Sequence, residues 1–146
     1  MVRLLISDKQ LKQSLLNLSI MPSKTFLTSF PPGIPTDLQR HVLRGIVDGD
    51  GCISIYKLKG YLVSEISITG TVELLEGIKD IFNIDKATFY KNPKKHRRNI
   101  TTMNIRERNQ QYKILKLLYS DCNFYIQRKY EKAQEAMELI YNKQTT

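Results

Sequence analysis

The sequence predicts a mixed α+β fold in which one antiparallel sheet is covered by helices on one face. Apolar and polar residues alternate through 52–58 and 61–68, on either side of Lys59-Gly60, and this pattern is typical of a β-hairpin. Helical spacing of apolar residues precedes and follows the hairpin. From Thr36 onward the predicted order is therefore α-β-β-α-β-β-α-α.

Each element is assigned from its apolar spacing and its flanking residues. A first helix over 7–20 is expected to begin at Ser7, and a second over 36–49 at Thr36 or Asp37, because short polar side chains cap helix starts. After the hairpin we expect a helix over 71–84, strands over 86–92 and 100–105, and helices over 107–120 and 127–142.

Proline marks a boundary near the start of the chain. Four of the five prolines lie between Pro22 and Pro35, which predicts an extended connector. We therefore expect residues 1–33 to form a helix with its connector, and residues 34–146 to form a single folded domain.

Composition limits the class of protein. A chain of 146 residues with 41% hydrophobic residues is sufficient for one globular domain. It has no apolar run near the roughly 18 residues of a membrane span and no signal peptide, so we expect an intracellular protein of the cytoplasm or an organellar matrix. Cys52 and Cys122 lack metal-binding spacing and are expected to be reduced core residues. The net charge of +9 favours a polyanionic partner, although charge alone also fits a ribosome or an anionic membrane.

Two aspartates, Asp48 and Asp50, lie at the predicted junction between helix and strand, in "LRGIVDGDG". An EF-hand calcium loop is excluded, because its terminal glutamate would fall on Lys59. One remaining interpretation is that both acids are turn residues at a helix end.

A second interpretation starts from Gly45 and Gly49, which are four residues apart and share one helix face. A second helix can approach such a face closely. The acids at the two helix ends would then meet, and paired carboxylates repel unless a cation such as Mg²⁺ lies between them.

The stretch 43–51 resembles the LAGLIDADG motif of the DOD-type homing endonucleases. The segments "CISI", "ITGTVELLEGIKDIF" and "QRKYEKAQ" match the same family in order, so that the resemblance covers 34–141. It implies an αββαββα fold with one four-stranded antiparallel sheet. The segment 6–25 also resembles 105–130, with Lys24 matching Lys129, which suggests that residues 1–33 are the tail of a lost first repeat.

The resemblance also implies roles for individual residues. Asp50 matches the acid that binds the divalent metal, with the carbonyl of Gly49 as a further ligand. Lys129 matches a catalytic basic residue near the scissile phosphate, with Arg128 beside it, although an ordinary solvated lysine would also fit this helix. Gly70 departs from the family, because several relatives carry a water-holding polar side chain there.

The function implied is a site-specific, double-stranded DNA endonuclease that uses Mg²⁺ or another divalent cation and acts as a homodimer on a long, pseudo-palindromic target. No membrane association is expected. Family members are encoded in introns, inteins or free-standing genes. Two alternatives share the scaffold without nuclease activity, namely a DNA-binding regulator and a maturase that binds RNA during splicing.

A two-stranded ribbon fits the DNA major groove, which suggests two sets of DNA contacts. With a period of two, the hairpin residues expected on the open face of the sheet are Ser54, Tyr56, Leu58, Tyr61, Glu65 and Ser67. Phosphate contacts are expected from the basic residues Lys91, Lys94, Lys95, Arg97 and Arg98, and Arg128 is also assigned to DNA binding. A solvated strand face and a solubilising basic loop remain the simpler alternatives.

The chain has one such motif and therefore one metal-binding acid. Cutting both strands of a DNA duplex takes two such acids, which implies two copies of the chain. The helix over 36–49 has two apolar faces, of which one is expected to cover the sheet and the other to contact a partner. The residues assigned to this dimer interface are Leu43, Gly45, Val47, Asp48 and Gly49.

Overall fold

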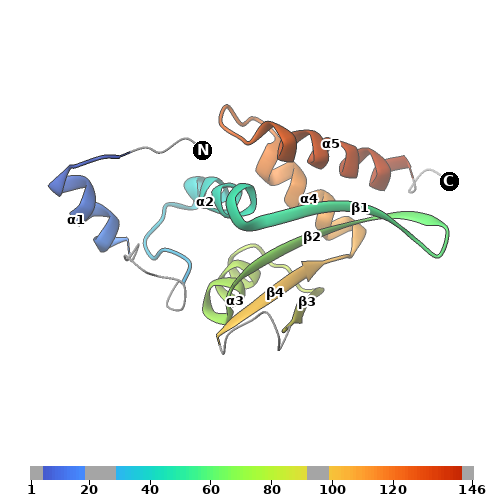
Figure 1. Ribbon diagram of the computed structural model, residues 1–146, viewed down its shortest axis with the longest axis horizontal. Coiled ribbons are helices and arrows are strands. Elements are labelled where there is room, and N and C mark those ends of the chain that lie inside the picture. Colours follow the sequence, from blue (N-terminus) through green and yellow to red (C-terminus); the bar gives the residue numbers. More distant parts are fainter. Residues whose placement is uncertain (1–4, 19–28, 92–98, 143–146) are drawn as a thin grey trace.

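The computed structural model describes residues 5–18, 29–91 and 99–142. Figure 1 shows the elements in chain order: α1 (Lys9–Asn17), α2 (Thr36–Asp50), β1 (Gly51–Leu58), β2 (Tyr61–Thr71), α3 (Val72–Ile81), β3 (Ala87–Tyr90), β4 (Ile100–Ile105), α4 (Arg108–Tyr119) and α5 (Gln127–Asn142). The predicted order is confirmed, with one expected element at every position.

The four strands form one antiparallel sheet in the order β1-β2-β4-β3. Ile53 of β1 lies opposite Ile66 of β2, which in turn lies opposite Ile105 of β4. Opposed residues in a ladder share a face, so these isoleucines define the covered side of the sheet. Their side chains are at most 6% exposed.

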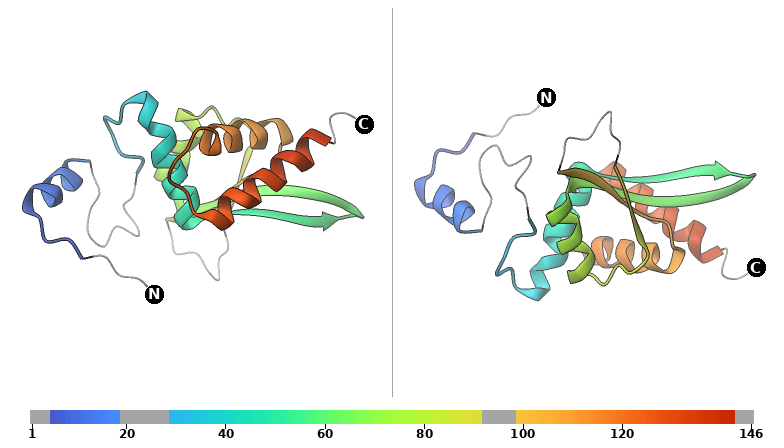
Figure 2. Two further views of the ribbon diagram at one scale, coloured as in Figure 1. Left: turned by 90° about the horizontal axis from the view of Figure 1, so that it is seen from above. Right: turned by 90° about the horizontal axis from the view of Figure 1, so that it is seen from below.

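Helices α2 to α5 bury their apolar residues against this covered face. The core that joins sheet to helices includes Leu43 and Val47 of α2, Leu75 of α3, Leu115 of α4 and Ala133 of α5. Seen from above, α2, α4 and α5 lie over the strands, whereas the view from below shows the hairpin uncovered in front of α5 (Figure 2). The α+β fold with helices on one face of the sheet is therefore confirmed.

The hairpin turn lies at the predicted position. Lys59 has φ 50° and Gly60 has φ 87°, and two successive left-handed residues make the tight turn that matches the twist of antiparallel strands. Glycine at the second of these positions adopts this conformation without steric cost.

Several helix starts differ from the sequence expectation. Asp8, not Ser7, caps α1, because its carboxylate accepts a hydrogen bond from the backbone N–H of Leu11 at 2.7 Å. Helix α2 begins at Thr36 with Pro35 in the capping position and no side-chain cap. Strand β2 runs on to Thr71, whose hydroxyl then caps α3.

The N-terminal segment contributes one residue to the core. Helix α1 has no buried residue, and Figure 1 shows it apart from the other helices. Phe30, by contrast, is 9% exposed and packs edge-on against Phe82, with ring centroids 6.0 Å apart. Lys24, the predicted counterpart of Lys129, lies outside the described residues.

The cysteines differ from each other in their surroundings. Cys122 is half-buried, and its thiol donates to the carbonyl of Tyr119 at 3.3 Å. Cys52 is exposed, so the expectation that it is a core residue is wrong, because its strand position places it on the open face of the sheet. No helix within the described ranges is long and apolar enough to cross a membrane.

Candidate metal centre and nucleic-acid interface

The inner side of the end of α2 holds a buried carboxylate. Asp48 is 7% exposed, and its two oxygens accept hydrogen bonds from the Tyr119 hydroxyl at 2.6 Å and from the Ile126 backbone N–H at 3.1 Å. One bond goes to the end of α4 and the other to the loop before α5. Asp48 therefore joins three segments that meet beside the predicted metal site.

Two polar side chains near Asp48, those of Tyr119 and Arg44, also have hydrogen-bond partners. Burial raises the pKa of Tyr119, and the hydrogen bond to Asp48 and the charge of that carboxylate raise it further, so the phenol stays protonated. The guanidinium of Arg44 donates to the carbonyl of Leu118 at 3.0 Å and lies 2.8 Å from Nδ1 of His41. The first contact joins α2 to the end of α4, and the second lies within α2.

The outer side of the same helix end carries the predicted metal ligands. Asp50 and Gly49 are both exposed, and no described residue forms a hydrogen bond or ion pair with the Asp50 carboxylate. The carboxyl end of a helix has a partial negative charge, which favours cations. Asp50 thus offers an exposed oxygen ligand of the kind that hard divalent cations prefer.

Lys129 of α5 reaches this junction from the inner side. Its side chain is 6% exposed, and its ammonium group donates to the carbonyls of Val47, at 3.3 Å, and of Gly51. A buried ammonium needs such acceptors, and the helix end supplies them. Lys129 therefore holds the residue that follows Asp50 in place.

At position 51 of this junction there is room only for glycine. A Cβ atom there would lie 2.7 Å from the carbonyl oxygen of Val47, which is backbone and cannot move aside. The last glycine of the motif thus lets the chain turn directly from α2 into β1, and this turn places Asp50 at the start of the sheet.

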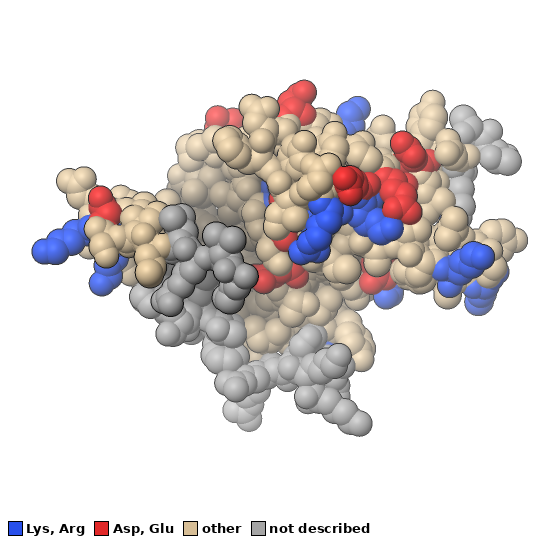
Figure 3. Space-filling view, turned by 45° about the horizontal axis from the view of Figure 1, so that its top comes forward, with Lys and Arg blue, Asp and Glu red and all other residues tan. Residues whose placement is uncertain are grey.

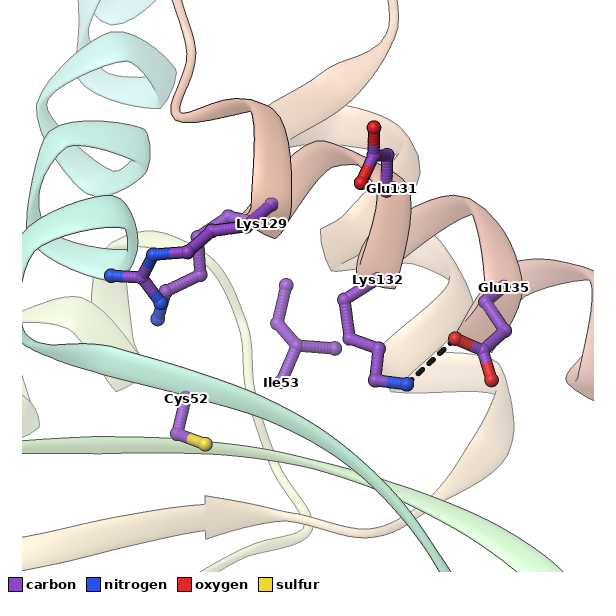
Figure 4. A pocket seen from close by; sticks show the side chains of 7 residues that line it. Cys52, Ile53, Lys129, Glu131, Lys132 and Glu135 are labelled. Carbon is purple, nitrogen blue, oxygen red and sulfur yellow. Dashed lines mark hydrogen bonds and ion pairs between the residues drawn. The ribbon is translucent and has the colours of Figure 1, made fainter.

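A hollow opens between the start of α5 and β1. It has a volume of about 370 Å³ and is lined by Cys52, Ile53, Arg128, Lys129, Glu131, Lys132 and Glu135. Figure 4 shows the Lys132 ammonium pointing toward Glu135, with which it forms an ion pair at 2.7 Å. Basic and acidic side chains lie next to one another on the face seen in Figure 3.

The open face of the sheet carries the residues predicted to contact DNA. Register places Ser54 opposite Glu65, Tyr56 opposite Val63 and Leu58 opposite Tyr61, so all of them lie on the side away from the core. Tyr61 is 71% exposed. Lys59 at the hairpin turn is exposed as well, and so is Lys57, although Lys57 pairs with Leu62 and alternates onto the opposite side of the ribbon. Neither lysine was assigned to DNA contact from the sequence.

A cluster on this open face includes a residue that the sequence reasoning missed. Glu65 accepts hydrogen bonds through one carboxylate oxygen from the Tyr56 hydroxyl, at 3.2 Å, and from Nε of Arg106. Arg106 directly follows Ile105, which pairs with Ile66, so register would have placed Arg106 beside Glu65. The signal was overlooked because Arg106 lies one residue beyond the end of the strand.

The predicted phosphate contacts are only partly within the described structure. Lys91 and Arg128 are exposed, and Arg128 lines the hollow at the start of α5. Lys94, Lys95, Arg97 and Arg98 lie outside the described residues, so their assignment stays a prediction.

The predicted dimer interface requires a correction. Leu43 and Val47 are fully buried and Asp48 is 7% exposed, so these three residues pack inside their own chain and cannot face a partner. The periodicity identified two apolar faces but assigned the wrong one to the core. The outward face instead combines Gly45 and Gly49 with Leu38, which is 48% exposed, and the half-buried Val42 and Ile46.

A scan of the sequence against protein-family models gave no match, and neither did a search of curated proteins. Solved structures do match. The homing endonuclease I-CvuI, in complex with its target in the presence of calcium, is 19% identical with a TM-score of 0.56, over 73% of this chain and 68% of that one. The LAGLIDADG meganuclease I-AabMI, bound to uncleaved DNA, is 22% identical with a TM-score of 0.56, over 76% of this chain and 38% of that one.

The group I intron-encoded homing endonuclease I-CeuI, complexed with DNA, is 16% identical with a TM-score of 0.57, over 73% of this chain and 55% of that one. The resemblance found in the sequence is therefore confirmed at the level of the fold, which is that of the LAGLIDADG homing endonucleases.

Proposed function

We propose, from this fold and the geometry at the end of α2, that the chain is a site-specific DNA endonuclease of the homing type. It would cut double-stranded DNA with Mg²⁺ or another divalent cation and would act as a homodimer. The observation that carries the proposal is that an exposed Asp50 and a buried Lys129 lie on opposite sides of one helix–strand junction, at the edge of an open sheet face.

The residues present fit a hard divalent cation. The carboxylate of Asp50 and the carbonyl of Gly49 are oxygen donors, and both residues are exposed at the negative end of α2. A bound metal ion would stabilise the negative charge that develops on the oxygens of a phosphodiester during hydrolysis. Within the described residues no group of three or more His, Cys, Asp or Glu side chains could hold a metal ion.

The rest of the junction would keep these donors in place. Lys129 fixes the Gly51 carbonyl, and Asp48 fixes the loop that leads into α5. Lys129 also brings a positive charge close to the proposed position of the scissile phosphate. Its contacts support a positioning role, in addition to any direct contact with the phosphate.

The outward face of α2 supports the homodimer. A Cβ atom at Gly45 or Gly49 would meet no atom within 4 Å in the described part of the chain, so the protomer itself does not require glycine there. Glycine in an exposed helix costs about 1 kcal/mol relative to alanine. Close approach of the same helix from a second copy explains both glycines, and it would bring a second Asp50 to the site.

The test is cleavage of DNA by the purified full-length protein. We would expose a plasmid library with a randomised insert to the protein with Mg²⁺ or with EDTA, and sequence the linearised products. We expect Mg²⁺-dependent double-strand cuts at related, pseudo-palindromic sites.

Asp50→Asn provides the matched variant, because it keeps the size of the side chain and removes the charge. Losing a metal ligand removes several kcal/mol of transition-state stabilisation, so cleavage should fall by roughly 1,000-fold while DNA affinity stays within a few-fold. Specific DNA binding by wild type without any cleavage would instead favour the regulator, and preferential binding of structured RNA would favour the maturase. Normal cleavage by Asp50→Asn would disprove the metal assignment.

A further inference from the structure

The open face of the sheet carries an arginine, Arg106, whose Nε atom is bound by a neighbouring carboxylate. Arg106 has 60% of its side chain exposed, whereas the side chain of Glu65 is only 13% exposed. Glu65 contacts the Nε atom of Arg106, and the same carboxylate oxygen accepts the hydroxyl of Tyr56. A guanidinium group has five N–H donors, so this bond leaves the four on the two terminal nitrogens for another partner.

The backbone beneath this cluster is also fixed. The side-chain amide of Gln111, a residue only 1% exposed, donates to the carbonyls of Ser64 at 2.9 Å and of Arg106 at 2.8 Å. Glu107, the next residue, caps α4 by accepting the backbone N–H groups of Asn109 and Gln110. One buried glutamine therefore ties together the two segments that carry Glu65 and Arg106.

This arrangement suits a base better than a phosphate. The carboxylate of Glu65 offsets the charge of Arg106, which weakens attraction to a polyanionic backbone. It also sets the plane of the guanidinium, and a fixed fork of two N–H donors matches O6 and N7 of guanine in the major groove. The neighbouring residues on this face, such as Ser54 and Tyr56, were already expected to lie in that groove.

We infer that Arg106 recognises one guanine in each half of the target site, with Glu65, Tyr56 and Gln111 as positioning residues that hold its guanidinium. This inference rests on the proposed function, because it takes the open face as the surface that contacts DNA. The fold alone specifies neither Arg106 as a base contact nor guanine as the base.

The experiment measures base preference rather than cleavage. We would select bound duplexes from a randomised library with the full-length protein in EDTA, and repeat the selection with Arg106→Ala, Arg106→Lys and Glu65→Gln. Wild type should prefer guanine at one position in each half-site by roughly 10- to 100-fold, the usual discrimination of a bidentate contact. Both substitutions of Arg106 should reduce that preference to within about threefold and leave the other positions unchanged.

Glu65→Gln distinguishes the positioning of the Arg106 guanidinium from the general attraction of the protein's charge to DNA. It removes a negative charge, so affinity for scrambled duplex should rise or stay constant, while the guanine preference falls. Arg108→Ala, which changes an exposed arginine on the first turn of α4, is the control and should leave all preferences in place.

An unchanged guanine preference in Arg106→Ala, or a loss of affinity equal for all sequences, would overturn the inference while the endonuclease proposal stands. A wild type with no preference among duplexes would overturn both.

Discussion

The inner and outer faces of α2 differ in almost every property. On the inner face Leu43 and Val47 are fully buried, and Asp48 has a hydrogen-bond donor for each carboxylate oxygen. On the outer face Gly45 and Gly49 meet nothing within 4 Å in the described chain, and Asp50 is exposed. Two residues along a helix turn the side chain by about 200°, so Asp48 and Asp50 lie on opposite sides.

This difference separates two roles that the motif brings together within three residues. The inner acid stabilises the fold by accepting hydrogen bonds from two donors. The outer acid has no hydrogen-bond partner among the described residues, which leaves its carboxylate accessible to a ligand. A change on the inner face should therefore affect stability first, and a change on the outer face should affect assembly and activity first.

Among changes that test this difference between the faces, the largest effect is expected for Gly45→Leu on the outer face. A leucine side chain there would keep a second α2 at a distance, because helices with larger contact residues pack farther apart. We expect the variant to be monomeric and to lose double-strand cleavage by at least roughly 100-fold, the cost of about 3 kcal/mol of interface contact. Mass by light scattering, with and without DNA, would show the change.

Gly51→Ala is the control for this prediction. Its Cβ atom would lie 2.7 Å from the Val47 carbonyl oxygen, so it should destabilise the folded chain, whereas Gly45→Leu should leave the unfolding free energy of the protomer nearly unchanged. A wild type that is monomeric while cutting both strands, or a Gly45→Leu protein that still dimerises, would contradict the assignment of the outer face.

The next effect is expected for Asp48→Ala on the inner face. The substitution leaves the buried Tyr119 hydroxyl and the partly buried Ile126 N–H without their acceptor. An unsatisfied buried donor costs about 1–3 kcal/mol, and a partly buried one costs less. Urea unfolding should therefore show a loss of roughly 2–4 kcal/mol. Asp50→Ala, two residues away and exposed, should change the unfolding free energy by less than about 0.5 kcal/mol. Equal losses in the two variants would remove the distinction between the faces.

The sequence predicted the fold well because its signals are local. Alternation over 52–58 and 61–68 with Lys59-Gly60 between them defines the hairpin, and helical spacing identifies each helix of the described residues to within a few positions. The exposed position of Asp50 also agrees with its predicted availability to a metal ion, although its role stays a prediction.

Some errors are local, such as the cap of α1 and the exposure of Cys52, but those at the candidate site concern contacts between elements. Periodicity showed that α2 has two apolar faces, but only packing against α4 and the sheet decides which face is buried, and so Leu43, Val47 and Asp48 were misassigned. The roles of Tyr119 and Gln111 were missed for the same reason. Their partners, Asp48 and Ser64, are 71 and 47 residues distant along the chain.

The smallest effect is expected from pH, through Tyr119 on the inner face. At pH 7 the phenol is protonated in both the folded and the unfolded chain. Losing its bond to the Asp48 carboxylate in Tyr119→Phe should cost about 1.5–3 kcal/mol, because the acceptor is charged. Burial and Asp48 raise the folded pKa of Tyr119, whereas the unfolded phenol ionises near pH 10. Above about pH 10 the unfolded state therefore gains stability that the folded state does not, by roughly 1.4 kcal/mol per pH unit. The advantage of wild type over Tyr119→Phe should thus be fully present at pH 7 and smaller by roughly 1.4 kcal/mol at pH 11. Urea titrations of both proteins at pH 7, 10 and 11 measure this difference, and the lysines and other tyrosines cancel because both proteins contain them. A difference that stays constant over this range would show that Tyr119 ionises as readily in the folded protein as in the unfolded one.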